Sequence, residues 1–386
     1  NVYNKDYSSY SLEDVCLEMS SLGKGDIREP FIEVTYPNGS STTDMVFDRA
    51  EIIQGKEEYD TLPGSYDDNG EVEQLVIYLK DRNYNLTLEL HYYVYEKCDI
   101  ITRSAKLVNS GNESVRLERL MSMQLDLNES DYELSFFNGA WAREMNRSRI
   151  PIRAGKYVNE SVTGTSSNRA NPFFMIGRSS TTEDYGECYG FNLIYSGNHY
   201  EAAQVNSYGK LRLVSGINPA TFSYIIEAGK CFEAPEAVLT YSYKGYNRMS
   251  HNMHEFVRKH IVRGSWRDKE RPVLINSWEA AYFNINERKL VKLAKAAKDT
   301  GVELFVMDDG WFGHRNDDSS SLGDWYVNEE KLNGGLKHLV DEVNKLGLKF
   351  GIWFEPEMIS PDSKLYEAHP DWAIQIPGRE GSLCRN

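Results

Sequence analysis

Hydrophobic and polar residues alternate along many short stretches of residues 1–245, which is the pattern of strands with one buried face. Two clear examples are residues 71–80, EVEQLVIYLK, and residues 86–95, LTLELHYYVY, both rich in β-branched and aromatic side chains. Turn sequences such as Pro37-Asn38-Gly39 and Asn138-Gly139 separate these stretches. Strands and turns repeated in this way predict a large β-sandwich.

The pattern changes to a helical period after residue 245. In residues 247–263, Met249 and Met253 lie on one predicted helix face, and Gly264 follows the last apolar position. We expect this helix to form a linker, residues 246–271, that joins two domains.

Strands and helices alternate in residues 272–386. Apolar strands are predicted at 273–278, 302–307 and 348–354, and amphipathic helices at 287–300 and 335–346. This alternation indicates parallel strands joined by helical crossovers. Polar and aromatic residues follow each strand, as at the mouth of a (β/α)8 barrel, where the chemistry of that fold is built. We therefore predict a multidomain β plus α/β chain whose second domain is the first three β/α units of an incomplete barrel.

Four residues at the ends of these strands are candidates for binding. Asp308 and Asp309 directly follow the strand at 302–307, where two carboxylates can accept hydrogen bonds from several hydroxyls of one sugar. Alternatively, Asp309 is part of a turn and Asp308 accepts from loop amides. Trp278 and Trp353 each end a predicted strand, where an indole either stacks on a pyranose ring or packs in the core beneath the loops.

Two further pairs suggest chemistry less strongly. Glu355 and Glu357 resemble an acid and nucleophile pair, but they lie two residues apart on one strand. Retaining glycosidases place such carboxyls about 5–5.5 Å apart on opposite sides of the scissile bond, so hydrogen bonds that orient Trp353 are the favoured interpretation. His251 and His254 do not have the His-Glu-x-x-His spacing of a zinc protease, and we predict no metal site.

Composition excludes several classes of partner. The chain has 43 Lys and Arg against 58 Asp and Glu, a net charge of −15, and no basic stripe, which argues against binding nucleic acid or anionic membranes. No run of about 18 apolar residues is present, so we expect no membrane-spanning segment. Five cysteines lie far apart and no leader sequence is visible. We therefore expect reduced thiols and a cytoplasmic location.

Motifs around the candidate residues resemble those of glycoside hydrolase family 36, the bacterial α-galactosidases. The segments that carry the resemblance are LINSWEAAYFN at 274–284, LFVMDDGWFG at 304–313, SLGDW at 321–325, FGIWFEPEMISP at 350–361, HPDW at 369–372, ITRSA at 101–105 and GFNLIYSG at 190–197. The resemblance implies an N-terminal β-supersandwich, a catalytic (β/α)8 barrel and a C-terminal β-domain, commonly assembled as a homotetramer. It also implies retaining hydrolysis of terminal α-galactosides such as melibiose and raffinose, without a metal or other cofactor.

The resemblance also implies roles for particular residues. The matching site residues are Trp278, Asp308, Asp309, Trp353 and Arg385. In the family pattern the two carboxylates bind galactose hydroxyls, the two indoles line the pocket, and the arginine contacts the sugar. The family's nucleophile lies in a later Lys-Trp-Asp motif and its acid/base aspartate lies further on. We expect both after Asn386, assign no catalytic residue within the chain, and expect these residues to be inactive by themselves.

Two other functions stay open. The chain could belong to an α-N-acetylgalactosaminidase, because the residues that distinguish the two sugars are expected after Asn386. It could instead be a non-catalytic carbohydrate-binding module in which the sandwich binds the sugar, and binding would then survive deletion of everything after Gly264.

Overall fold

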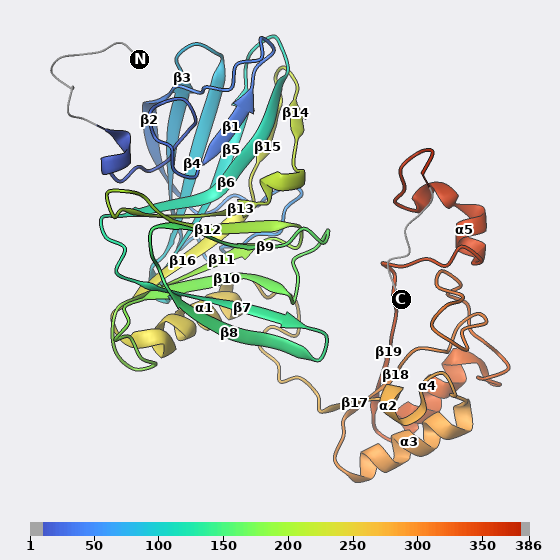
Figure 1. Ribbon diagram of the computed structural model, residues 1–386. Coiled ribbons are helices and arrows are strands. Elements are labelled where there is room, and N and C mark those ends of the chain that lie inside the picture. Colours follow the sequence, from blue (N-terminus) through green and yellow to red (C-terminus); the bar gives the residue numbers. More distant parts are fainter. Residues whose placement is uncertain (1–10, 380–386) are drawn as a thin grey trace, which may run out of the picture. The chain divides into compact units, whose positions relative to one another are not determined.

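The computed structural model describes residues 11–379, and the chain divides into two compact units, Asn1–Arg267 and Asp268–Asn386. The first unit is a β-sandwich, and the second holds a small parallel sheet with helices (Figure 1). Between residues 11 and 379, none of the helices combines the length and the apolar composition needed to cross a bilayer. Short 3-10 helices are η2 (Leu12–Asp14), η3 (Glu96–Cys98), η4 (Pro219–Thr221) and η5 (Pro370–Trp372).

Two antiparallel sheets make up the sandwich. Along the six-stranded sheet the order is β1 (Ile32–Thr35), β6 (Val115–Leu127), β13 (Leu211–Ile217), β12 (His199–Val205) and β9 (Gly155–Glu160), with β14 (Tyr224–Ile226) also paired to β6. Along the ten-stranded sheet the order is β2 (Met45–Gln54), β3 (Glu73–Asp81), β4 (Leu86–Tyr95), β5 (Ile100–Asn109), β16 (Glu236–Ser242), β11 (Cys188–Ile194), β10 (Ala170–Gly177), β7 (Glu133–Ala140) and β8 (Arg143–Pro151), with β15 (Cys231–Glu233) paired to β5. The strands predicted at 71–80 and 86–95 are β3 and β4.

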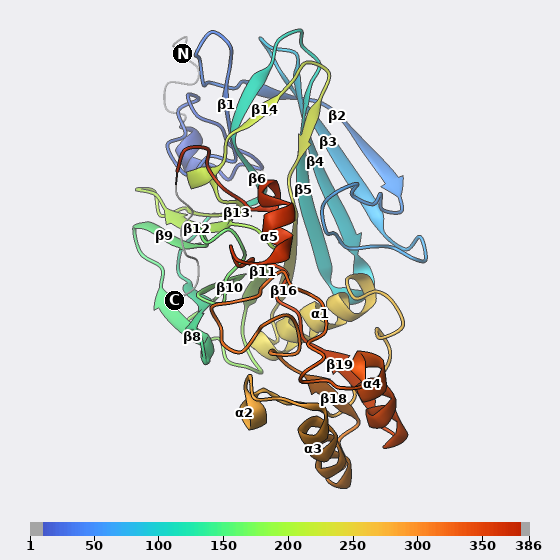
Figure 2. The ribbon, with the colours of Figure 1, turned by 90° about the vertical axis from the view of Figure 1, so that its right-hand side faces the viewer.

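The main core lies between the two sheets, which Figure 2 shows side by side with β9, β12 and β13 in one layer and β2 to β5 in the other. Leu88 and Leu107 of the ten-stranded sheet are in the same buried cluster as Leu117 and Val214 of the six-stranded sheet. Alternate residues of a strand point to opposite faces. The alternation read from the sequence therefore decides which side chains enter this core.

Helix α1 (Gly245–His260) covers the other face of the ten-stranded sheet. In β10, Phe174 belongs to the core between the sheets, whereas Met175 packs with Met249 and Met253 of α1. Gly190 of β11 allows this close approach, because a Cβ there would lie 2.4 Å from the sulfur of Met249. The helix predicted for the linker is therefore present, but it packs within the first unit, and the boundary between the units follows Arg267.

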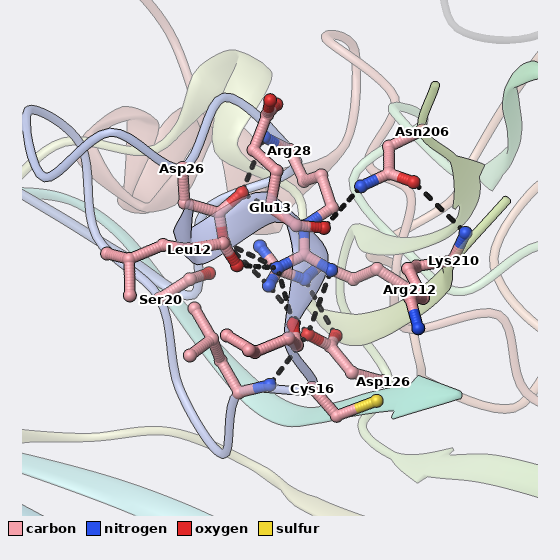
Figure 3. Close-up of polar contacts among 12 residues, drawn as sticks. Leu12, Glu13, Cys16, Ser20, Asp26, Arg28, Asp126, Asn206, Lys210 and Arg212 are labelled. Carbon is pink, nitrogen blue, oxygen red and sulfur yellow. Dashed lines mark hydrogen bonds and ion pairs between the residues drawn. The ribbon is translucent and has the colours of Figure 1, made fainter. Parts of the chain in front are cut away.

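A buried charge cluster, Asp26, Arg28, Asp126 and Arg212, fastens the segment before β1 to the six-stranded sheet (Figure 3). Arg212 pairs with Asp26 at 2.8 Å and with Asp126 at 2.7 Å, and Arg28 pairs with Asp26 at 2.9 Å. Burial by itself would raise the pKa of Asp26, but its hydrogen bonds with Arg28 and the charge of Arg212 hold that pKa below its usual value. The ion pairs and hydrogen bonds within the cluster compensate for the hydration that these charged groups lose on folding.

Parallel strands β17 (Leu274–Asn276), β18 (Leu304–Met307) and β19 (Lys349–Ile352) form the sheet of the second unit. The helices of this unit are α2 (Trp278–Ala281), α3 (Glu287–Asp299), α4 (Gly335–Lys345) and α5 (Lys364–Ala368). Leu290 of α3 and Leu339 of α4 share a buried cluster with Phe305 and Met307 of β18, so both helices pack on one face of the sheet. The three parallel strands and the two amphipathic helices are those that the sequence predicts.

Candidate functional site

The carboxyl ends of the three parallel strands lie side by side at one end of the sheet. Asn276 of β17 lies opposite Val306 of β18, which lies opposite Gly351 of β19. The ladder continues beyond these positions, because the Trp353 amide donates to the carbonyl of Met307 at 3.0 Å. The strand register thus brings the backbone at Trp278, Asp308 and Trp353 to the same carboxyl-terminal end of the sheet.

Asp308 is 9% exposed and is held by its neighbours. Its Oδ2 accepts a hydrogen bond from the side-chain amide of Asn276, and its Oδ1 accepts from the Asp309 amide at 2.7 Å. Its own amide donates to Ser277 Oγ at 3.1 Å. An ionised carboxylate has about four lone-pair sites. The Asp308 carboxylate can therefore still accept hydrogen bonds from a ligand.

Asp309 is engaged by Arg315 from the loop that follows β18. Arg315 is fully buried and donates from Nε to Asp309 Oδ1 at 3.0 Å and from Nη2 to Oδ2 at 2.9 Å. The Gly310 amide also donates to Asp309 Oδ1 at 2.6 Å, and Gly310 has a φ of 94°. The turn that the sequence offered as an alternative is present, and a contact between Asp309 and a sugar stays a prediction.

Lys331 fastens the same loop to the segment after α2. Its Nζ donates to the carbonyl oxygens of Phe283, Gly310 and Arg315 at 3.1, 2.8 and 2.9 Å. Burial lowers the pKa of Lys331, although the nearby Asp309 carboxylate opposes this effect. The loop that carries the aspartates is thus fixed by two cations, the buried Arg315 and the half-buried Lys331.

Sequence reasoning missed Asn276, Arg315 and Lys331. The available signal was weak: Arg315 lies in a loop rich in Gly, Asp and Ser, where an arginine a few residues after paired aspartates suggests an internal ion pair. Lys331 lies 22 residues after Asp309, as their numbers show. Contacts over that distance in sequence depend on how the loop folds.

The two candidate indoles are both half-buried. Trp278 begins α2 instead of ending a strand, and its ring lies edge-on to the rings of Tyr282 and Phe283, with centroids 5.1 and 5.0 Å apart. Trp353 packs against the core of the second unit, and its carbonyl accepts from Trp311 Nε1 at 3.0 Å. Trp353 therefore combines core packing with an accessible part, whereas Trp278 packs on neighbouring aromatic rings. Stacking on a sugar stays a prediction for both.

The remaining candidates are the glutamate pair, the histidine pair and Arg385, and the structure brings neither pair together as a site. Glu355 is buried whereas Glu357 is exposed, which does not suit a facing pair of catalytic carboxyls. His251 and His254 are both exposed on α1, and residues 11–379 contain no cluster of three side chains suited to hold a metal ion. Arg385 lies outside the described residues.

Two family models together match nearly the whole chain. The glycosyl hydrolase family 36 N-terminal domain matches residues 1–227, and the Melibiase model matches residues 231–386. The chain belongs to glycosyl hydrolase family 36. The resemblance read from the motifs is thereby confirmed.

Curated relatives in family 36 support the assignment. Alpha-galactosidase AgaA of Geobacillus stearothermophilus is 44% identical over 379 residues, which covers 98% of this chain and 52% of that protein. Alpha-galactosidase Mel36A of Lactobacillus acidophilus is 41% identical over the same length, with the same coverage. The chain therefore spans about half the length of the curated relatives it matches.

Solved family 36 structures share this fold. The alpha-galactosidase from Lactobacillus brevis superimposes with a TM-score of 0.95 at 42% identity, covering 98% of this chain and 51% of that one. A variant of AgaA from Geobacillus stearothermophilus in complex with raffinose gives a TM-score of 0.96 at 42% identity, covering 99% of this chain and 54% of that one. The expectation of a β-sandwich followed by parallel β/α units is confirmed.

Proposed function

We propose that the protein to which this chain belongs is a retaining α-galactosidase that removes terminal non-reducing α-D-galactosyl residues from oligosaccharides such as melibiose and raffinose. Family membership supports this proposal, and so do the structures of AgaA variants in complex with raffinose and with stachyose. The observation that carries it is the Asp308 carboxylate, oriented at the shared edge of three parallel strands by Asn276. A carboxylate fixed in this way is suited to bind sugar hydroxyls.

The second unit is proposed to be the first part of a (β/α)8 barrel. Its three parallel strands, with helices on one face, agree with this assignment. In the complete site, Asp308 would bind galactose directly, with Asp309 beside it and Arg315 holding Asp309 in place. Trp278, Trp353 and Arg385 would line the sugar pocket. The domain limits proposed from the sequence are 1–245 for the sandwich and 272–386 for the early barrel.

The nucleophile and the acid/base are proposed to lie outside residues 1–386. The chain contains no Lys-Trp-Asp, the motif in which the family nucleophile is expected. Removing both groups removes the covalent route and the protonation of the leaving group. We therefore propose that these residues bind sugar but do not hydrolyse it.

We further propose a cytoplasmic homotetramer. Cys16, Cys98, Cys188 and Cys231 are free thiols, which agrees with a reducing compartment. Size-exclusion chromatography with light scattering on the protein extended through the rest of the barrel measures the assembly.

Hydrolysis assays test the function. We expect the extended protein to release nitrophenol from nitrophenyl α-galactoside and to prefer it over nitrophenyl α-N-acetylgalactosaminide. We expect the 386-residue chain to release none. The reverse substrate preference would identify an α-N-acetylgalactosaminidase. Full turnover by the 386-residue chain would overturn the proposed location of the catalytic residues.

A further inference from the structure

A groove in the first unit carries a set of exposed aromatic and aliphatic side chains. It encloses about 900 Å³ at the ends of β4, β5, β11 and β16, and we call it the tyrosine groove. Its apolar lining includes Val94, Ile101, Tyr189, Leu239, Tyr241 and Tyr243. Tyr189 and Leu239 also pack against the core between the two sheets. The groove therefore continues the core-facing surface of the ten-stranded sheet out to solvent.

Two tyrosines give this groove an accessible aromatic surface. Tyr241 is 45% exposed and Tyr243 is 65% exposed. The ring of Tyr241 packs against that of Tyr189, with centroids 4.9 Å apart, so its position is fixed on one side and open on another. Tyrosine rings offer contact area at a low cost in conformational entropy. They suit a ligand with flat apolar faces.

The charged side chains that line the groove balance one another. The acidic ones are Glu18, Glu96 and Asp99, and the basic ones are Arg103, Lys244 and Arg248. Arg103 pairs with Glu18 and Arg248 pairs with Asp99, in both cases at 2.7 Å. A balanced lining does not favour a strongly anionic or cationic ligand. It presents hydrogen-bond donors and acceptors of both signs to a neutral ligand.

We propose that the tyrosine groove is a second carbohydrate site, which binds a neutral oligosaccharide independently of the Asp308 site. The C–H faces of its sugar rings stack on Tyr241 and Tyr243, and its hydroxyls bond to the Arg248–Asp99 and Arg103–Glu18 pairs. Carbohydrates combine apolar ring faces with many neutral hydroxyls, which is the chemistry that this lining complements. The site does not depend on hydrolysis.

Binding of stachyose to the 386-residue chain tests the proposal. The chain carries Asp308→Ala so that the strand-end site is weakened, and saturation-transfer NMR follows the titration. We expect stachyose to bind this variant, and we expect Tyr241→Ala combined with Tyr243→Ala to weaken binding at least tenfold. Tyr208→Ala is the matched control, because Tyr208 is 54% exposed on the turn between β12 and β13, and it should leave binding unchanged.

Two results would overturn the proposal. One is the absence of stachyose binding by the Asp308→Ala chain whose circular dichroism matches that of the parent. The other is an unchanged affinity after removal of both tyrosines. If the tyrosine pair instead alters the sedimentation coefficient and no sugar binds, the groove is an interface between copies of the chain. The hydrolysis assay is unaffected by these outcomes, so failure here is distinguishable from failure of the proposed enzyme function.

Discussion

Single side chains at the strand ends carry most of the functional argument. Each oxygen of Asp308 accepts one hydrogen bond and keeps acceptor capacity for a ligand, whereas Asp309 accepts from Arg315 with both oxygens and from the Gly310 amide as well. Asp308 and Asp309 thus differ in their capacity to accept hydrogen bonds from a ligand. The difference depends on which of them faces a buried guanidinium.

Replacing Asp308 by Ala in the extended protein should lower kcat/KM for nitrophenyl α-galactoside. Loss of two charge-assisted hydrogen bonds to a sugar costs about 3 kcal/mol, which corresponds to roughly a hundredfold. Asp317→Ala is the control, because Asp317 is exposed in the loop after β18, and it should change kcat/KM less than about twofold. Equal effects of the two substitutions would contradict the role given to Asp308.

The stability of the sandwich should fall in acid. Since the pKa of Asp26 is below its usual value in the folded chain, its contribution to stability is complete above the unfolded pKa of about 3.9 and is lost as the pH falls through the folded pKa. Urea unfolding followed by circular dichroism from pH 7 to acid pH measures this loss. Asp26→Asn should flatten the acid limb, whereas Asp131→Asn, at a side chain 89% exposed, should leave it unchanged.

At the scale of elements, the loop after β18 and helix α1 show how local segments are held. The loop has no regular structure over most of its length, yet Arg315 and Lys331 tie it to the strand end and to the segment after α2. Helix α1 is held by apolar contacts with the ten-stranded sheet. One element depends on buried charge and the other on packing, so they respond to different substitutions.

Arg315→Ala should destabilise the second unit by about 3–5 kcal/mol, because it leaves the Asp309 carboxylate buried without its partner. Arg315→Lys should recover only part of this loss, because an ammonium cannot make the two parallel hydrogen bonds. Arg288→Ala on the exposed side of α3 is the control. Urea unfolding monitored by tryptophan fluorescence reports on this unit, where most of the tryptophans lie. An Arg315→Ala variant as stable as the control would contradict the account.

Phe256→Ala should destabilise the first unit by about 3–5 kcal/mol, since it removes a large side chain that is 1% exposed. The ring also lies edge-on to Tyr95, with centroids 4.9 Å apart. Val257→Ala offers a neighbouring control on the same helix, because Val257 is 43% exposed. Urea midpoints from circular dichroism separate the two variants, and similar midpoints would show that α1 contributes little to the unit.

Sequence periodicity predicted the elements well but missed how some of them begin and end. Helices α3 and α4 were predicted within one residue of their ends, because their apolar stripes and terminal glycines are local signals. Trp278 was predicted to end a strand and instead begins α2. Its amide donates to Asn276 Oδ1 at 2.7 Å, and a side-chain contact of this kind turns the chain without altering the hydrophobic pattern.

For the whole molecule, the second unit exposes apolar side chains along its edge strand β17 and just before it. Val273, Leu274 and Ile275 are 58%, 53% and 42% exposed, and β17 and β19 are open edges of the sheet. Further strands would cover such edges in a closed barrel. Unpaired edges and apolar patches promote association.

The 386-residue chain should therefore self-associate, and the protein extended through the rest of the barrel should not aggregate. Size-exclusion chromatography with light scattering at several concentrations measures this difference. Replacing Leu274 and Ile275 by Lys should reduce the association of the short chain, whereas Ile27→Lys, at an exposed position of the first unit, should have little effect. A monodisperse monomeric short chain would contradict the prediction.

The sequence by itself determined the sandwich, the parallel units and the strand ends at which the candidate residues lie, because alternation, helical period and turn residues act over a few neighbouring positions. Tertiary structure decided which side chains remain available there. The hydrogen bond of Lys331 to Phe283, the amide of Asn276 on Asp308 and the assembly of the tyrosine groove join residues that are distant in sequence. Such contacts depend on how strands register and loops fold, and no local pattern encodes them.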